Sequence, residues 1–265
     1  MIIDENLTLQ RVDSDDLDAS GRCIVPYGVQ KIDSIAFGLC PDVKVVVLPN
    51  TVTEIAALAF EGCKQMQHIN LPNSLTAIGS AAFYDCRSLE QVIVPDSVQK
   101  LGEKVFAHCL ALQELTLPTK LKRISAHLCF DCKQLKQVNI PSTVKSIGSH
   151  AFEHCYNLKK IVLPESLEQI RMCAFAFCSG LERIEIPSSV IAIAQSAFSF
   201  CRSLTDIQMS SATEIRSNTF INCNKNLKIQ YYKENDLDDL FDKAINSKFA
   251  DGSSVLVDEE FETER

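Results

Sequence analysis

Apolar residues in this chain recur every 23 positions over most of its length. Prolines and cysteines keep the same spacing, and phenylalanines follow it with one interruption. The three series are Pro26, Pro49, Pro72, Pro95, Pro118, Pro141, Pro164 and Pro187; Cys40, Cys63, Cys86, Cys109, Cys132, Cys155, Cys178 and Cys201; and Phe37, Phe60, Phe83, Phe106, Phe152, Phe175 and Phe198. Three residue types with one period indicate a stack of structural repeats.

Each unit divides into an alternating part and a part with wider spacing. Residues 94–117 read VPDSVQKLGEKVFAHCLALQELTL. The alternation of Leu112, Leu115 and Leu117 predicts a short strand with one buried face, and the next proline ends that strand. The apolar residues of V-x-x-I-x-x-x-A-F-x-x-C lie three or four apart, which predicts a helical or 3-10 return limb.

These motifs resemble a known family. The elements LP, IG-x-x-AF and C-x-x-L, which recur over residues 24–231, are similar to the leucine-rich repeat family, BspA-like (treponemal-type, 23-residue repeat) subclass. The resemblance implies an α/β fold: a right-handed solenoid with a parallel sheet on its concave side and short helical or 3-10 limbs on its convex side. It also implies a protein-binding role, because several such bacterial and protozoan surface or secreted proteins act as adhesins or virulence factors.

The period also predicts how the chain is organised. Residues 1–23 form an N-terminal cap with a degenerate coil, in which Leu17 takes the cysteine position. Residues 24–231 form about nine repeats. Residues 232–265 form a C-terminal cap, with an amphipathic helix over 233–249 and an acidic tail over 258–265.

Nine of the twelve cysteines share one repeat position, three residues after the phenylalanine. Free cysteine packs as a small hydrophobe, so we expect a buried ladder of reduced thiols; disulfides or a metal are the alternatives. Cys129 falls at a phenylalanine position, and Cys132 is an ordinary rung. We expect this coil to pack less well than its neighbours, with Phe130 supplying the lost volume, and Cys129→Phe with Phe130→Tyr to raise stability.

Two groups of side chains suggest metal or redox chemistry. Cys129 and Cys132 form a C-x-x-C pair, and His127, His150 and Cys173 share a repeat position on successive coils. Such residues bind zinc or exchange electrons. No carboxylate occupies the same repeat position, so we interpret the row as a polar stripe. We predict no metal site and no cofactor.

The predicted strands present two outward rows, which we take as the binding surface for a protein partner. The first row is Val45, His68, Gln91, Glu114, Gln137, Lys160, Arg183 and Asp206, and the second is Val47, Asn70, Ile93, Thr116, Asn139, Val162, Glu185 and Gln208. Repeat proteins bind on such extended surfaces. A polar face with scattered apolar residues suits a protein partner better than a nucleic acid.

Charge and composition exclude several classes of function. The formal net charge of −8 argues against a general nucleic-acid binder. No run of about 18 apolar residues is present, so we expect no membrane insertion. The first residues lack the pattern of a signal peptide. With reduced cysteines, this predicts a cytoplasmic protein, or one exported without a signal peptide into a reducing compartment; the acidic tail is a candidate export signal.

The sequence therefore predicts a non-catalytic protein–protein interaction module. We find no nucleophile with a base, paired acids, P-loop or G-x-G-x-x-G motif. A bacterial effector or adhesin-like virulence factor acting on a host protein is the leading hypothesis. The alternatives are a metal- or redox-responsive protein that uses Cys129/Cys132 or the His127/His150/Cys173 row, and an intracellular structural scaffold.

Overall fold

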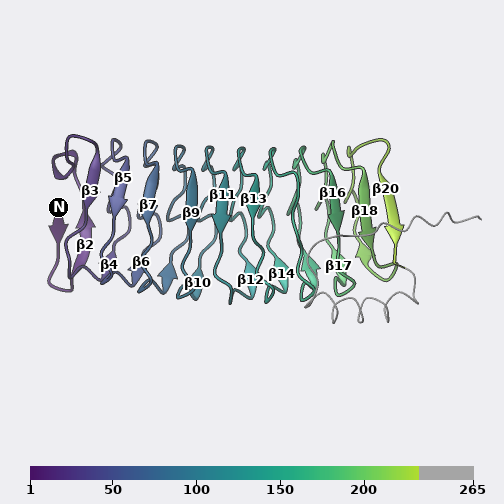
Figure 1. Ribbon diagram of the computed structural model, residues 1–265, viewed down its shortest axis with the longest axis horizontal. Coiled ribbons are helices and arrows are strands. Elements are labelled where there is room, and N and C mark those ends of the chain that lie inside the picture. Colours follow the sequence, from purple (N-terminus) through teal and green to yellow (C-terminus); the bar gives the residue numbers. More distant parts are fainter. Residues whose placement is uncertain (233–265) are drawn as a thin grey trace, which may run out of the picture. The chain divides into compact units, whose positions relative to one another are not determined.

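The computed structural model describes residues 1–232, which form a stack of about ten similar coils (Figure 1). All but one of the coils contribute a strand to a first stack, the main strands; the exception is the coil of residues 158–163, where the alternating pattern predicts a strand and none forms. The main strands are β3 (Arg22–Ile24), β5 (Val45–Val47), β7 (His68–Asn70), β9 (Gln91–Ile93), β11 (Glu114–Thr116), β13 (Gln137–Val138), β16 (Arg183–Glu185), β18 (Asp206–Met209) and β20 (Lys228–Tyr231).

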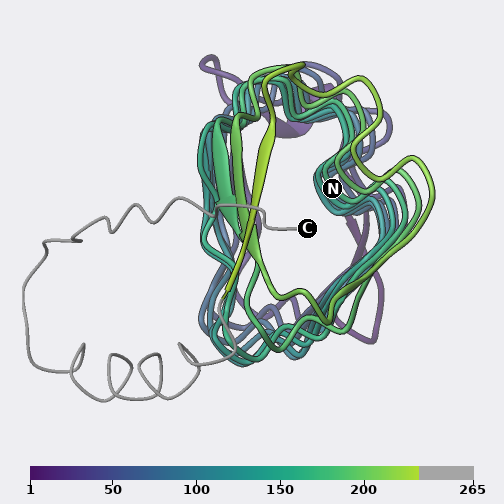
Figure 2. The ribbon, with the colours of Figure 1, turned by 90° about the vertical axis from the view of Figure 1, so that its right-hand side faces the viewer.

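Most coils contribute a second, shorter strand to another stack, the second strands. These are β2 (Thr8–Arg11), β4 (Lys31–Ile32), β6 (Glu54–Ile55), β8 (Ala77–Ile78), β10 (Lys100–Leu101), β12 (Arg123–Ile124), β14 (Ser146–Ile147), β15 (Gln169–Ile170), β17 (Ala192–Ile193) and β19 (Glu214–Ile215). An antiparallel strand, β1 (Ile2–Ile3), pairs with β2. In an end-on view the described coils lie over one another (Figure 2).

The register of the ladders equals the period of the sequence. Val46 pairs with Ile69 in the main strands, and Ile55 pairs with Ile78 in the second strands, all in parallel. The predicted alternation is confirmed: Leu112, Leu115 and Leu117 are each at most 2% exposed. The N-terminal coil keeps the same register, since β2 pairs with β4 and β3 pairs with β5.

The predicted helical return limb is wrong. Within residues 1–232 the one helical segment is a 3-10 turn, Ser14–Asp16, outside the repeats. In the limb, the backbone N–H groups of Leu58 and Phe60 donate to the next coil, to the carbonyls of Ser80 and Ala82 at 3.0 and 2.8 Å. Because these donors bond between coils, they are lost to the i→i−4 ladder that a helix requires.

Two positions in the limb take the left-handed backbone conformation in most coils, which also prevents a helix. The residues at the first of these repeat positions have φ between 54° and 62°: Leu58, Ala81, Lys104, His127, His150, Cys173, Ser196 and Asn218. Their side chains therefore leave the backbone with the same geometry in successive coils. Gly79 lies between the second strand β8 and Ala81, where neighbouring coils approach closely. A Cβ at this position would lie 2.3 Å from the backbone nitrogen of Ala57, so only glycine fits.

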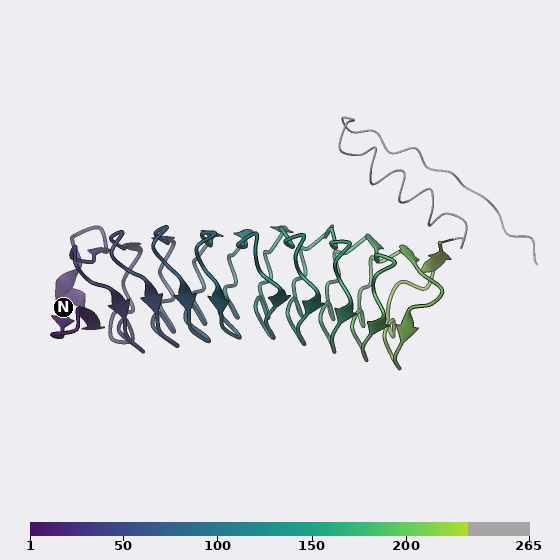
Figure 3. The same cartoon turned by 90° about the horizontal axis from the view of Figure 1, so that it is seen from below.

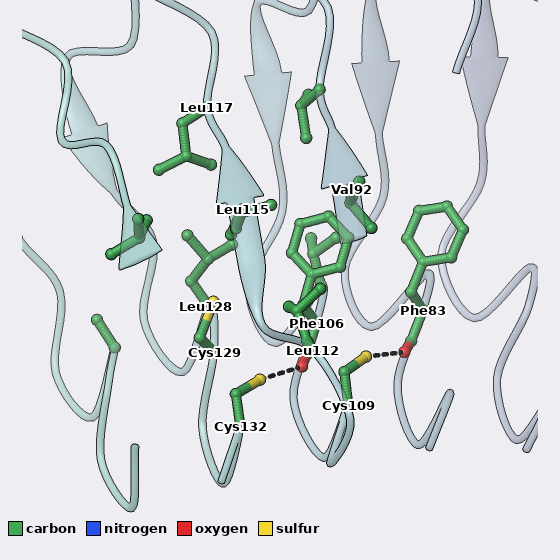
Figure 4. Close-up of a cluster of buried hydrophobic side chains, with 14 of the residues drawn as sticks. Phe83, Val92, Phe106, Cys109, Leu112, Leu115, Leu117, Leu128, Cys129 and Cys132 are labelled. Carbon is green, nitrogen blue, oxygen red and sulfur yellow. Dashed lines mark hydrogen bonds between the residues drawn. The ribbon is translucent and has the colours of Figure 1, made fainter. Parts of the chain in front are cut away.

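Two columns of like side chains, phenylalanine and cysteine, run through a core that also contains buried leucine, isoleucine and valine. Phenylalanine rings stack along the molecule, with centroids 4.5 Å apart for Phe37 and Phe60 and 5.5 Å apart for Phe83 and Phe106. Beside them, the cysteine Sγ of one coil donates to the carbonyl of the phenylalanine position in the preceding coil, as from Cys109 to Phe83 at 3.2 Å (Figure 4). Cysteine at this position therefore satisfies a buried acceptor as well as filling space.

The coil that contains Cys129 restores its volume in a way that the sequence did not suggest. Cys129 is fully buried in the phenylalanine column, next in line after Phe106 (Figure 4). Phe130 does not fill the gap: it is half-buried, and its ring contacts the imidazoles of His108 and His154. Leu128, fully buried where most coils carry alanine, supplies the extra atoms.

Met1–Tyr231 form one compact unit. Both stacks of strands run along this unit (Figure 3). The predicted C-terminal helix at 233–249 and acidic tail at 258–265 lie outside the described residues.

Candidate functional site

All sixteen residues of the two predicted rows lie at the surface, and we call this surface the strand face. Thirteen lie on the main strands, whereas Asn139, Lys160 and Val162 occupy the same position in their coils on segments that form no strand. Twelve of the sixteen are exposed, and Val45, Val47, Asp206 and Gln208 are half-buried. The sequence thus predicted the direction of each side chain correctly, because alternation along a strand fixes it. That these residues bind a partner stays a prediction.

The strand face combines two exposed apolar side chains with charged and amide groups. Ile93 is 62% exposed and Val162 is 69% exposed. Around them, the Arg183 guanidinium lies 3.7 Å from the Asp206 carboxylate in the next coil. Lys160 is exposed. This mixture provides both hydrophobic area and orienting charges.

Two of the predicted binding residues have a structural role. The Asn70 side chain accepts a hydrogen bond from the Leu48 N–H at 2.8 Å and donates to the Leu48 carbonyl at 2.9 Å. Asn139 bridges Leu117 in the same way, at 2.7 and 3.3 Å. These amides complete the backbone hydrogen bonding of the preceding coil. Alternation alone did not reveal this role.

A hollow of about 380 Å³ lies over the turn-rich limb, and its lining includes His127, His150 and Glu153. The two imidazole rings are stacked, with centroids 4.7 Å apart. The His150 Nδ1 lies 2.6 Å from a Glu153 carboxylate oxygen. The His127 Nδ1 is buried without a hydrogen-bond partner among the described residues. Burial, followed by repulsion from His150, lowers the pKa of His127.

The predicted row of His127, His150 and Cys173 is brought together only in part. The residues whose ligand atoms lie within 4.8 Å of one another are His150, Glu153 and Cys173. The sequence prediction missed Glu153 because it searched for a carboxylate at the same repeat position. The turn after His150 brings the Glu153 side chain, three residues later, back beside the His150 imidazole.

The Cys129-x-x-Cys132 pair lies in the core. Both cysteines are fully buried, and the Cys132 Sγ donates to the Phe106 carbonyl at 3.0 Å (Figure 4). Burial raises the pKa of Cys129 well above that of an ordinary thiol. Burial of both thiols away from solvent disfavours disulfide exchange with a partner protein.

The repeat geometry matches a known family. A sequence profile described as "BspA type Leucine rich repeat region (6 copies)" matches residues 30–159 and 126–237. The chain belongs to the BspA-type leucine-rich repeat family. The predicted family resemblance is thereby confirmed.

Solved structures of bacterial leucine-rich repeat proteins are similar to this BspA-type chain. A leucine-rich repeat protein from Bacteroides ovatus is 26% identical with a TM-score of 0.70, over 87% of this chain and 69% of that chain. A leucine rich cell surface protein from Faecalibacterium prausnitzii is 25% identical with a TM-score of 0.51, over 82% and 74%. The leucine-rich repeat protein of T. pallidum is 32% identical with a TM-score of 0.49, over 52% and 64%.

No curated protein sequence matches this BspA-type chain significantly. Among residues 1–232, no helix combines the length and the apolar composition that a membrane span requires.

Within the BspA-type stack, the reactivity of the thiols follows from their place in the coil. All twelve cysteines are free; ten are buried, and Cys173 and Cys223 are half-buried. Burial raises the pKa of Cys63 to about 12. Cys223 differs, because side-chain hydrogen bonding with Cys201 lowers its pKa. Burial, followed by the charge of Glu153, raises the pKa of Cys173.

Proposed function

We propose that this protein is a non-catalytic interaction module that binds a protein partner on its strand face, the side that the sequence predicts to be concave. The observation that carries the proposal is the exposure of Ile93 and Val162, at 62% and 69%. Both side chains stand in the second outward row, Ile93 on β9 and Val162 on a segment that forms no strand. Apolar residues surrounded by polar ones are typical of the centre of a protein–protein interface.

The strand face also suits binding where its strands form parallel ladders. Val45–Val47 pairs with His68–Asn70, and Gln91–Ile93 pairs with Glu114–Thr116. A preformed surface loses little conformational entropy when a partner docks. The charges of Lys160, Arg183 and Asp206 near the apolar residues would orient the partner and set its specificity.

The test compares variants on opposite sides of the coil. Ile93→Glu and Val162→Glu each place a charge on the strand face. Ile191→Glu is the matched control, because Ile191 is 64% exposed but precedes the second strand β17. Immobilised wild-type and variant proteins are incubated with cell extracts, and the retained proteins are quantified by mass spectrometry. The partner is then purified, and its affinity is measured for each variant.

We expect the partner to bind wild type and Ile191→Glu alike. Each strand-face variant should lose about 1–2 kcal/mol of binding free energy or more, as residues at the centre of an interface do. Equal affinity for all variants, or loss with Ile191→Glu alone, would place the interface elsewhere. Failure to retain any protein specifically would contradict the proposal.

We further propose that the partner is a host protein and that the chain acts as an effector or adhesin-like factor. The support is the resemblance of the repeat to those of bacterial surface and secreted proteins. Deletion of residues 258–265 tests the acidic tail as an export signal. Export should stop while the thermal unfolding of the protein stays unchanged; unchanged export would contradict the tail as an export signal, and a wild-type protein that is not exported would favour a role as an intracellular scaffold.

A further inference from the structure

Three side chains of different chemistry converge on the limb beside the hollow. They are the imidazole of His150, the carboxylate of Glu153 and the thiol of Cys173, and their ligand atoms all lie within 4.8 Å of one another. We propose that these three residues bind a zinc ion and leave its fourth coordination position open to water. The site is independent of the strand face.

The backbone of two neighbouring coils holds the cluster. His150 and Cys173 occupy the same repeat position in the left-handed conformation, with φ of 59° and 54°. Their side chains therefore project in the same direction, one coil apart. The His150 N–H donates to the carbonyl of Met172 at 2.9 Å, which ties the two ligand-bearing segments together. Ligands on such a fixed frame bind a metal without ordering the chain first.

Glu153 joins the cluster through a turn. Its N–H donates to the His150 carbonyl at 3.4 Å, and one carboxylate oxygen lies 2.6 Å from the His150 Nδ1. The other carboxylate oxygen lies 3.8 Å from the His154 Nε2. The Glu153 side chain is only 13% exposed. An acidic side chain withdrawn from water beside two imidazoles favours a cation at this place.

The donor set selects the metal. Sulfur and imidazole nitrogen suit zinc, whereas calcium and magnesium prefer oxygen ligands alone. Zinc bonds of 2.0–2.3 Å in a tetrahedron place ligand atoms about 3.3–3.8 Å apart. Side-chain rotations that move the ligand atoms by about 1 Å would bring them to these distances around the ion. When zinc binds, the S–H bond of Cys173 is replaced by an S–Zn bond, and the proton passes to solvent.

The surroundings support an open coordination position. The hollow of about 380 Å³ borders His150 and Glu153, so water reaches the cluster from this side. His127 also lines the hollow and stacks on His150, which fixes the plane of the ligating ring. The His127 Nδ1 is buried and lacks a hydrogen-bond partner among the described residues.

The chain itself offers a matched control. His108 lies 3.1 Å from the carboxylate of Asp131, in a histidine–acid pair similar to that of His150 and Glu153. That pair is not part of the three-ligand cluster found among residues 1–232. His108→Asn therefore removes an imidazole beside a carboxylate while the proposed ligands stay in place.

The experiment measures metal binding by the full chain, reduced and freed of metal with a chelator. Cobalt(II) is titrated as a spectroscopic substitute, and the thiolate-to-cobalt absorption is recorded. Zinc affinity is then measured by competition with a chromophoric chelator. The variants are Cys173→Ser, His150→Asn and Glu153→Gln, with His108→Asn as control. Asparagine is chosen at position 150 because it tolerates a positive φ.

We expect one equivalent of cobalt to produce the thiolate absorption in wild type and His108→Asn. Cys173→Ser should abolish that absorption, and each ligand variant should weaken zinc binding by more than about 100-fold, beyond what loss of an outer-shell residue causes. Circular dichroism shows that the variants keep the fold. Absence of the absorption in wild type, or an equal loss with His108→Asn, would mean adventitious binding and overturn the proposal.

Discussion

At the scale of single residues, the phenylalanine column changes where Cys129 interrupts it. Rings at this position stack along the molecule, as Phe83 and Phe106 do at 5.5 Å. Cys129 has fewer atoms than a phenylalanine, yet it is fully buried. Leu128 is larger than the alanine that most coils carry and is equally buried. The two exceptions therefore compensate each other within one coil.

This pairing gives a stability prediction that revises the one made from the sequence. Cys129→Phe alone should destabilise the protein by about 1–3 kcal/mol, because the ring and Leu128 compete for one space. Adding Leu128→Ala should recover the loss and restore the ring stack. Urea unfolding of both variants measures the difference. Phe130→Tyr is the control, since its ring lies on the surface side of the coil.

The opposite result would show that Leu128 does not occupy the missing ring's space. In that case Cys129→Phe alone would be at least as stable as wild type, and Leu128→Ala would lower its stability further by leaving a cavity.

Thiol reactivity provides a second prediction at this scale. Cys173 and Cys223 are half-buried, and the other ten cysteines are buried. The pKa of Cys223 is lowered and that of Cys173 is raised. Because the thiolate is the reactive form, iodoacetamide should modify Cys223 first as pH rises, and Cys173 only at higher pH.

Peptide mass spectrometry at a series of pH values checks this order. The remaining cysteines should react only after unfolding. Early modification of Cys129 or Cys132 in the native protein would instead support a redox role for that pair.

At the scale of elements, most of the main strands could be predicted from the sequence, whereas the second strands and the limbs could not: Ile78 of β8 lies in the segment that the sequence predicts as a helical limb. Alternation with a fixed period determines both the buried face and the register of the strands. Apolar spacing of three and four residues does not distinguish a helix from successive turns. The distinction depends on where the N–H groups bond, and Phe60 bonds to Ala82 in the next coil. The sequence of a single repeat does not contain that hydrogen-bond partner, which belongs to the next coil.

The asparagine bridges belong to this scale, because they link one element to the next. Asn70→Ala should cost about 1–3 kcal/mol, since it leaves the Leu48 N–H and carbonyl without their partners. His68→Ala on the same strand is the control and should change stability by less than about 0.5 kcal/mol. Thermal and urea unfolding measure both. Equal effects would mean that the bridge contributes no stability.

At the scale of the whole molecule, the described stack has four interruptions: one divides the main ladder between β7 and β9, and the other three fall between β10 and β16. The second strands divide into two sheets between β10 and β12. The phenylalanine column is broken at Cys129. Residues 158–163 contain no strand, so the main ladder is interrupted between β13 and β16. Each interruption removes interactions between neighbouring coils, and such interactions hold a solenoid together.

We therefore expect the middle coils to open more readily than those on either side. Native-state hydrogen exchange should show lower protection over residues 119–163 than over the coils around β5 and β16. Uniform protection along residues 24–209 would show that the interruptions have no energetic consequence.

The candidate sites could be predicted in part. The strand face follows from alternation, so every residue of its two rows could be placed outward. The zinc cluster required Glu153, whose side chain reaches His150 only through the turn at positions of positive φ. Turn geometry of that kind produces no repeating pattern of residue types from which it could be predicted.

The central claim is that a protein partner binds the strand face, and hydrogen exchange of the complex tests it most directly. Exchange is compared between the free protein and the protein saturated with its captured partner. We predict that protection rises in β9 around Ile93 and in the segment around Val162, with little change in the second strands around Ile193. Protection confined to the second strands, or to the limb around His150, would contradict the account.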